Sequence, residues 1–306
     1  MANKRIFWVF IALTVIYIME VLLIPPDSSA LAKFRLSETE AKLLALTFAL
    51  PIAFVWMLGS YVYIKFKSYV DSISNYKDGR IFSTISTGVL LLCLWLPIST
   101  IVSNLSNYAY RVQPSWTMPL VIINNYLNLL LVLAALLLIY KGASELSSLK
   151  EAKKASGWKY LALIPIIAIS EFYIFLTLNN PARQFPTEDV KTAGYYMPDW
   201  LIIGTVVIPY ILVFYYGFFA VLNLYIYRRK VRGIIYKSAL DYFAKGLFCI
   251  VTSIVFIRYL ASSSSAFSDS TLKTILLIIY LLLVILLLGF VLMVKSVKKL
   301  EKIEKV

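Results

Sequence analysis

Residues 118–159 read MPLVIINNYLNLLLVLAALLLIYKGASELSSLKEAKKASGWK. A long apolar run is followed by a segment that carries Lys141, Lys150, Lys153, Lys154 and Lys159. A helix of ~20 apolar residues crosses the ~30 Å hydrocarbon core of a membrane. Because cytoplasmic loops retain Lys and Arg, the stretch predicts a membrane-spanning helix that ends on the cytoplasmic side.

The same pattern recurs along the whole chain. Apolar runs cover residues 6–24, 43–64, 82–103, 118–140, 160–178, 200–226, 242–260 and 274–294. Every second gap is basic, namely 65–80, 141–159 and 227–241, and so are both tails. The alternation predicts an all-α, polytopic transmembrane bundle of about eight spans with both termini in the cytoplasm.

Composition excludes an ordinary soluble domain, because 60% of the residues are hydrophobic and the mean hydropathy is +0.80. The net charge of +14 is spread over short loops beside the spans. We therefore expect these loops to contact the lipid bilayer and its anionic headgroups, and no nucleic acid. We expect no targeting peptide and a location in the cytoplasmic membrane of a prokaryote. The first span is followed by Ala30-Leu31-Ala32, an A-x-A pattern like that of a signal-peptide cleavage site. The length of the span and the presence of Glu20 favour its retention in the mature protein.

The chain contains no His, and Cys93 and Cys249 both lie inside predicted spans. Imidazole is the commonest general base and metal ligand in proteins, and Cys within a span behaves as a small apolar residue. The sequence therefore predicts no metal, no cofactor and no enzymatic activity.

The two halves of the sequence resemble each other. A shift of 158 residues places Pro51 on Pro209, Gly59 on Gly217 and Gly88 on Gly246. Segments 15–20 (VIYIME) and 166–171 (IIAISE) also align. We interpret this as a tandem duplication of a four-span unit, with repeats at 1–154 and 155–306. Because each unit has an even number of spans, the copies would be related by a two-fold axis along the membrane normal.

Acidic residues within the spans give the sharpest chemical signal. Glu20 and Glu171 align in the two repeats and lie in the outer third of the membrane. Such residues usually face protein or water and often have a function. Arg258 is a candidate counter-ion, and a Glu–Arg pair has a purely structural interpretation as an alternative to a binding site.

Further polar and helix-bending residues complete the candidate site. Asn124 and Asn128 lie one helical turn apart on one face of their span, suited either to hydrogen bonds between helices or to a hydrated cavity. Pro51 and Pro209 bend helices, while Gly59 and Gly217 permit close helix approach. The alternative is that these four residues serve packing alone.

Two functions remain. The first is a transporter or channel-like protein for a small solute or cation, in which Glu20 and Glu171 bind the cation and Asn124 and Asn128 the substrate. The alternative is a non-catalytic membrane scaffold or assembly protein, in which the same polar groups lock helices together.

The topology is tested by reporter tags fused to the first and last residues. Both tags should be protected from protease added to intact cells and should become accessible after permeabilisation. A tag inserted in the predicted outer gap 179–199 is the matched control and should be cleaved in intact cells. Cleavage of either terminal tag would contradict the assigned topology.

Overall fold

The computed structural model describes residues 2–24, 37–73, 77–112, 114–148, 208–263 and 269–304. Within these ranges the chain forms helices and no strand, which confirms the all-α class for the part described. The helices are α1 (Ala2–Leu23), α3 (Glu38–Ser72), α4 (Lys77–Val112), α5 (Pro114–Ser148), α11 (Ile208–Lys230), α12 (Ile234–Ser263) and α13 (Asp269–Glu304).

Seven of the described helices are long and apolar enough to cross a membrane. They correspond to the predicted spans except the fifth, because residues 160–178 lie outside the described residues. The eighth span and the repeat therefore stay predictions. Several helices are longer than expected: α3 has 35 residues, or ~52 Å, and so extends beyond ~30 Å of hydrocarbon.

Local sequence explains where α3 begins and how it continues. The Ser37 backbone N–H donates to Glu40 Oε2 at 2.8 Å, and the Glu40 N–H donates to Ser37 Oγ at 3.3 Å. This reciprocal pair is a capping box, which satisfies backbone donors at a helix start. Pro51 lies inside α3 and Pro97 inside α4, and both helices continue through them.

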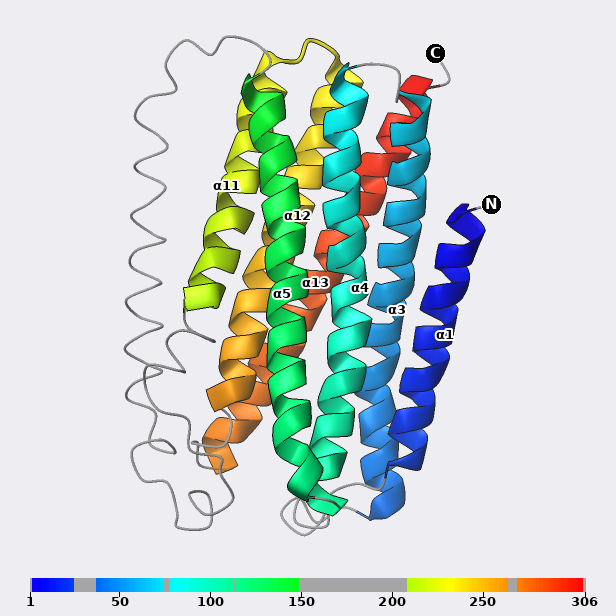
Figure 1. Ribbon diagram of the computed structural model, residues 1–306, viewed down its shortest axis with the longest axis vertical. Helices are drawn as coiled ribbons and strands as arrows, with labels where there is room; N and C mark the ends of the chain where they lie inside the picture. Colours follow the sequence, from blue (N-terminus) through cyan, green and yellow to red (C-terminus); the bar gives the residue numbers. More distant parts are fainter. Residues whose placement is uncertain are drawn as a thin grey trace.

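The helices form one bundle in which elements distant in sequence are neighbours (Figure 1). The pairs α4–α5 and α12–α13 make the most extensive contacts, and α3 packs on α4 as α11 packs on α12. Contacts of α3 with α13 and of α5 with α11 join the N-terminal and C-terminal halves. Helix α1 lies at one edge, against α3 and α4.

Small residues let the two most extensive pairs approach closely. A Cβ atom added to Gly88 of α4 would lie 2.7 Å from the Ala135 carbonyl oxygen of α5. A Cβ added to Gly246 of α12 would lie 2.6 Å from the Gly289 carbonyl oxygen of α13. Both distances are too short for a real side chain, so backbone meets backbone at these positions. Such small-residue contacts are typical of helix packing in membranes.

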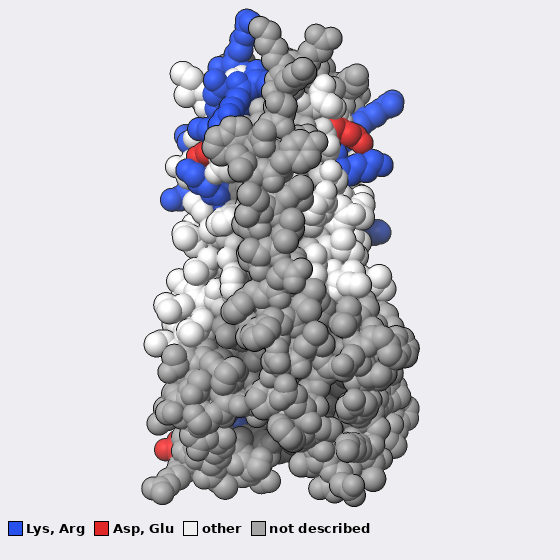
Figure 2. Space-filling view, turned by 90° about the vertical axis from the view of Figure 1, so that its left-hand side faces the viewer, with Lys and Arg blue, Asp and Glu red and all other residues white. Residues whose placement is uncertain are grey.

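Basic residues lie toward one end of the bundle (Figure 2). Contacts bring the charged helix ends together there, since Lys65 of α3 pairs with Glu301 of α13 at 2.7 Å. Lys230 of α11 donates to the Ser147 carbonyl of α5. The N-terminal end of α1 and the C-terminal end of α13 point toward this same end (Figure 1).

The close approach of α12 and α13 is tested by Gly246→Ala. The added methyl group would push the α13 backbone away, so unfolding in detergent should become easier by about 1–3 kcal/mol, the usual cost of overpacking. Gly233→Ala is the matched control, because its Cβ would lie at an ordinary 3.7 Å from Tyr236. Equal melting temperatures for Gly246→Ala and the wild type would contradict the described packing.

Candidate functional site

Helix α1 presents a narrow buried stripe to the rest of the bundle. Phe10, Tyr17 and Glu20 are buried, whereas Trp8 and Leu23 are largely exposed. The spacing of seven and then three residues puts the buried positions on one helical face. Because α1 packs on α3 and α4 with this face, Glu20 points into protein rather than into lipid.

Among the described residues, Glu20 is the acidic residue whose side chain is buried, with 9% of its surface exposed. The Asn104 Nδ2 amide of α4 donates to Glu20 Oε2 at 3.5 Å, a long hydrogen bond. Among the described residues, Glu20 forms no ion pair. A carboxylate can accept about four hydrogen bonds. Glu20 therefore keeps the capacity to bind a further donor or a cation.

Two aromatic rings lie on the same side of α1 as this carboxyl group. Tyr17 is one turn before Glu20, and its ring centroid lies 4.8 Å from that of Trp56 on α3. Trp56 is 1% exposed, and its indole Nε1 donor has no hydrogen-bond partner among the described residues. An unpaired buried donor is costly, which indicates an acceptor that the described residues do not supply.

The combination of groups suits a small cation or a cationic solute. A carboxylate attracts positive charge, and the faces of Tyr and Trp attract cations within ≈ 6 Å of the ring centroid. The Asn104 amide and the Trp56 indole add hydrogen-bonding groups for an oxygen-bearing molecule. These described groups all belong to the first half of the chain, on α1, α3 and α4.

Most of the other predicted site residues lie outside what the structure describes. Glu171 is outside the described residues altogether. Asn124 and Asn128 belong to α5 and Arg258 to α12, but the side chains of all three are outside the description. Whether Glu20 meets Glu171 or Arg258 therefore stays a prediction.

The glycines that follow the two predicted bends both lie at helix contacts. A Cβ on Gly59 would lie 3.2 Å from Cys93 Sγ of α4 and 3.3 Å from Phe290 of α13. A Cβ on Gly217 would lie 2.7 Å from Val251 of α12. Pro51 lines an apolar crevice near Gly59, whereas the Pro209 side chain is outside the description.

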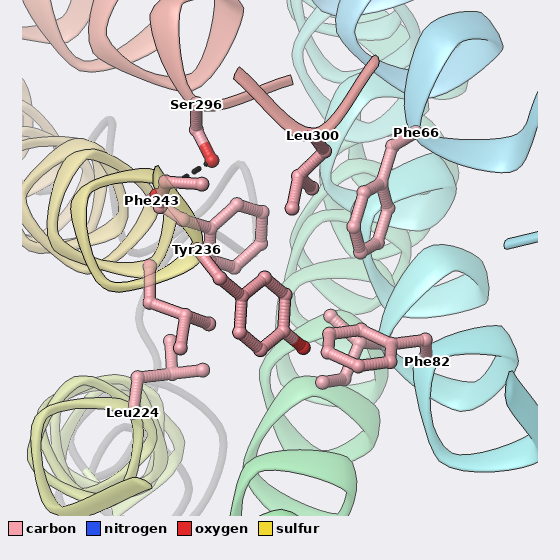
Figure 3. A pocket seen from close by; sticks show the side chains of 10 residues that line it. Phe66, Phe82, Leu224, Tyr236, Phe243, Ser296 and Leu300 are labelled. Carbon is pink, nitrogen blue, oxygen red and sulfur yellow. Dashed lines mark hydrogen bonds between the residues drawn. The ribbon is translucent and has the colours of Figure 1, made fainter. Parts of the chain in front are cut away.

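Aromatic and aliphatic side chains fill the centre of the bundle near its basic end (Figure 3). Phe66 of α3 stacks on Phe243 of α12 with ring centroids 5.6 Å apart. Phe82, Leu224 and Leu240 complete the packing around a cavity of about 10 Å³. This volume is about that of one water molecule, so the two halves meet here without an open passage.

Of the four residues Tyr17, Glu20, Trp56 and Asn104, sequence reasoning found only Glu20. Tyr17 carried a usable signal, because it lies three residues before Glu20 and so shares its helix face. Asn104 directly follows the predicted span 82–103, and its polar side chain was a candidate hydrogen-bond partner for Glu20. Trp56 carried no signal, since an aromatic residue within a span is ordinarily explained by packing.

The described residues contain no group of three or more His, Cys, Asp or Glu placed to hold a metal ion. No protein-family model, curated protein or solved structure matches the chain.

A double-mutant cycle tests the Glu20–Asn104 contact. The coupling energy between Glu20→Ala and Asn104→Ala should be about 0.6 kcal/mol, and at most about 1.7, as for other hydrogen bonds between membrane helices. It is measured from the unfolding of both single variants and the double variant. Ser99→Ala replaces Asn104→Ala in the control cycle, because Ser99 bonds to Leu96 of its own helix. Equal coupling in the two cycles would contradict a specific contact.

Proposed function

We propose that this protein transports a small solute or cation across a prokaryotic cytoplasmic membrane, with Glu20 as a binding group. Its partners are that solute and the anionic lipid headgroups at the cytoplasmic face. Seven apolar helices make it compatible with a multi-pass membrane protein. No cofactor or enzymatic step is part of the proposal.

The observation that carries the proposal is the incomplete bonding around Glu20. A buried carboxyl group to which the described residues donate one hydrogen bond, of 3.5 Å, is a costly feature in a membrane. A buried indole donor without a partner among the described residues lies in the same packed region. If these groups served packing alone, apolar side chains would fill the same volume at lower cost. A bound solute that supplies positive charge and an acceptor accounts for both groups.

Repeated contacts support the tandem duplication. Gly59 lies against Cys93, and the residues 158 positions later, Gly217 and Val251, lie against each other. Gly88 also meets the backbone of Ala135, as Gly246 meets that of Gly289, which lies 154 positions after Ala135 in the register that aligns residues 140–146 with 294–300. The pairs of helices involved are α3–α4 with α11–α12, and α4–α5 with α12–α13. Equivalent residues thus make equivalent contacts in the two halves.

The contacts between the halves support the same two-fold relationship. Lys65 of α3 pairs with Glu301 of α13 at 2.7 Å. The residue 158 positions after Lys65 is Asn223 of α11, and the Ser147 hydroxyl of α5 lies 3.5 Å from the Asn223 Oδ1 atom. Ser147 corresponds to Glu301 when YKGASEL at 140–146 is aligned with VKSVKKL at 294–300. Each half therefore binds the other through equivalent positions.

The relative directions of α5 and α11 support an eighth crossing. The C-terminal ends of both helices lie together, because Lys230 of α11 contacts Ser147 of α5. The chain leaves α5 at this end but enters α11 from the opposite direction. This arrangement supports the prediction of a further span at 160–178. With that crossing, the two termini lie on one side, which the basic residues assign to the cytoplasm.

The filled centre of the bundle favours a transporter over an open channel. Between the halves, Phe66, Phe82 and Phe243 leave room for about one water molecule near the basic end. A solute that reaches Glu20 from outside would cross only after helices move relative to one another. Helix α1 is suited to such movement, since only a narrow stripe of its surface is buried.

A non-catalytic scaffold is the second candidate, and the same filled centre is the observation that favours it. In that case Glu20 and Asn104 hold α1 in place, and the basic end contacts lipid or a cytoplasmic protein. Stable co-purification of one protein partner, together with absence of flux, would support the scaffold.

Flux into liposomes that contain the purified protein tests the transport function. Uptake of Rb⁺, Na⁺, protons and methylammonium is measured against protein-free liposomes. For the transported probe, Glu20→Gln should lower uptake about tenfold, which corresponds to about 1.4 kcal/mol of lost binding free energy. Glu145→Gln is the matched control on an exposed position and should leave uptake unchanged. Uptake equal in the wild type and in Glu20→Gln would contradict the role of Glu20.

A further inference from the structure

An apolar crevice opens between α3 and α13, on the lipid-facing surface where the two halves of the chain meet. It has a volume of about 140 Å³. Its lining residues include Pro51, Ile52, Val55, Leu96, Leu283 and Leu287. An apolar cavity of about 150 Å³ is large enough to bind benzene. The crevice can therefore hold several carbons of a chain, but it offers little to a polar ligand.

The crevice lies in the middle and outer part of the proposed membrane region. Val55 is ten residues, and Pro51 fourteen residues, from Lys65 at the basic end of α3. At ~1.5 Å per residue these positions are ~15 and ~21 Å from that end. A hydrocarbon core of ~30 Å then places the crevice from the bilayer centre into the outer leaflet. One turn further toward the basic end on α3, Phe290 of α13 lies against Gly59.

Exposed apolar residues adjoin the lining residues in the sequences of both helices. Leu50 and Phe54 of α3 and Leu281 and Leu288 of α13 are each at least half exposed. In a membrane these side chains contact lipid, so acyl chains are the molecules present at the opening. A void beside them would forfeit van der Waals contacts that an inserted chain restores.

We propose that the crevice between α3 and α13 is a binding site for one acyl chain of an outer-leaflet phospholipid. The chain enters past Tyr280, which lines the outer part, and its terminal methyl group lies toward Gly59 and Phe290. Because α3 and α13 belong to different halves, the bound chain fills their interface and stabilises it. This site is separate from Glu20, and its existence does not depend on transport.

Photolabelling tests the site in the intact protein. The wild type is reconstituted into phosphatidylcholine vesicles that contain a phosphatidylcholine with a diazirine near the end of one acyl chain. After illumination, adducts are located by mass spectrometry of peptides. Val55 is buried and should be labelled several-fold more than Val62, an equally buried residue on α3 away from the crevice. Equal labelling of Val55 and Val62 would overturn the proposal, whatever the variants below do.

A variant that fills the crevice provides a second photolabelling test. Leu283→Trp should occupy the opening and reduce labelling of Val55 several-fold, while labelling of exposed Leu281 stays the same. Leu130→Trp places the same side chain on an exposed position of α5 and should leave Val55 labelling unchanged. Unchanged labelling of Val55 in Leu283→Trp would also overturn the proposal. So would crosslinking between two protein copies through this face, since a second copy would then be the occupant.

Discussion

In hydrocarbon, backbone N–H and C=O groups find no water to bond with and must form hydrogen bonds inside the protein. The rest of this structure depends on that constraint. Each span is helical because N–H and C=O groups in lipid must bond within the chain. The helices then need a reason to associate, since lipid tails are as apolar as Leu side chains. Gly88 and Gly246 supply it by letting α4 meet α5 and α12 meet α13 at backbone distance. Van der Waals contact over these long pairs forms the framework on which α1, α3 and α11 pack.

The site around Glu20 results from the way the edge helix joins this framework. Helix α1 contributes few buried residues, so its attachment relies on Phe10, the Tyr17–Trp56 contact and the Glu20–Asn104 hydrogen bond. The centre of the bundle near its basic end is filled instead by aromatic side chains such as Phe66 and Phe243.

Hydropathy alone predicted the helices, because the length of an apolar run and the position of Lys and Arg follow directly from solvation. The ends of α3 and α13 were predicted too short, since a helix continues into water where its sequence is amphipathic. The surroundings of Glu20 were less predictable. Asn104 reaches Glu20, and Trp56 reaches Tyr17, through the rotation of α4 and α3 about their axes, which hydropathy does not determine. The crevice at Val55 likewise arises from shape, and no residue pattern indicates it.

Two contacts between the halves differ in chemical type, and this affects how the bundle responds to dissolved salt. Lys65 and Glu301 form an ion pair whose side chains are partly in water, so dissolved salt screens it. The contact of Ser147 with Asn223 is neutral and buried, so ionic strength has little effect on it. A rise in salt concentration would therefore weaken the Lys65–Glu301 ion pair more than the Ser147–Asn223 contact. The electrolyte concentration would therefore act unequally on the two sides of the interface between the halves.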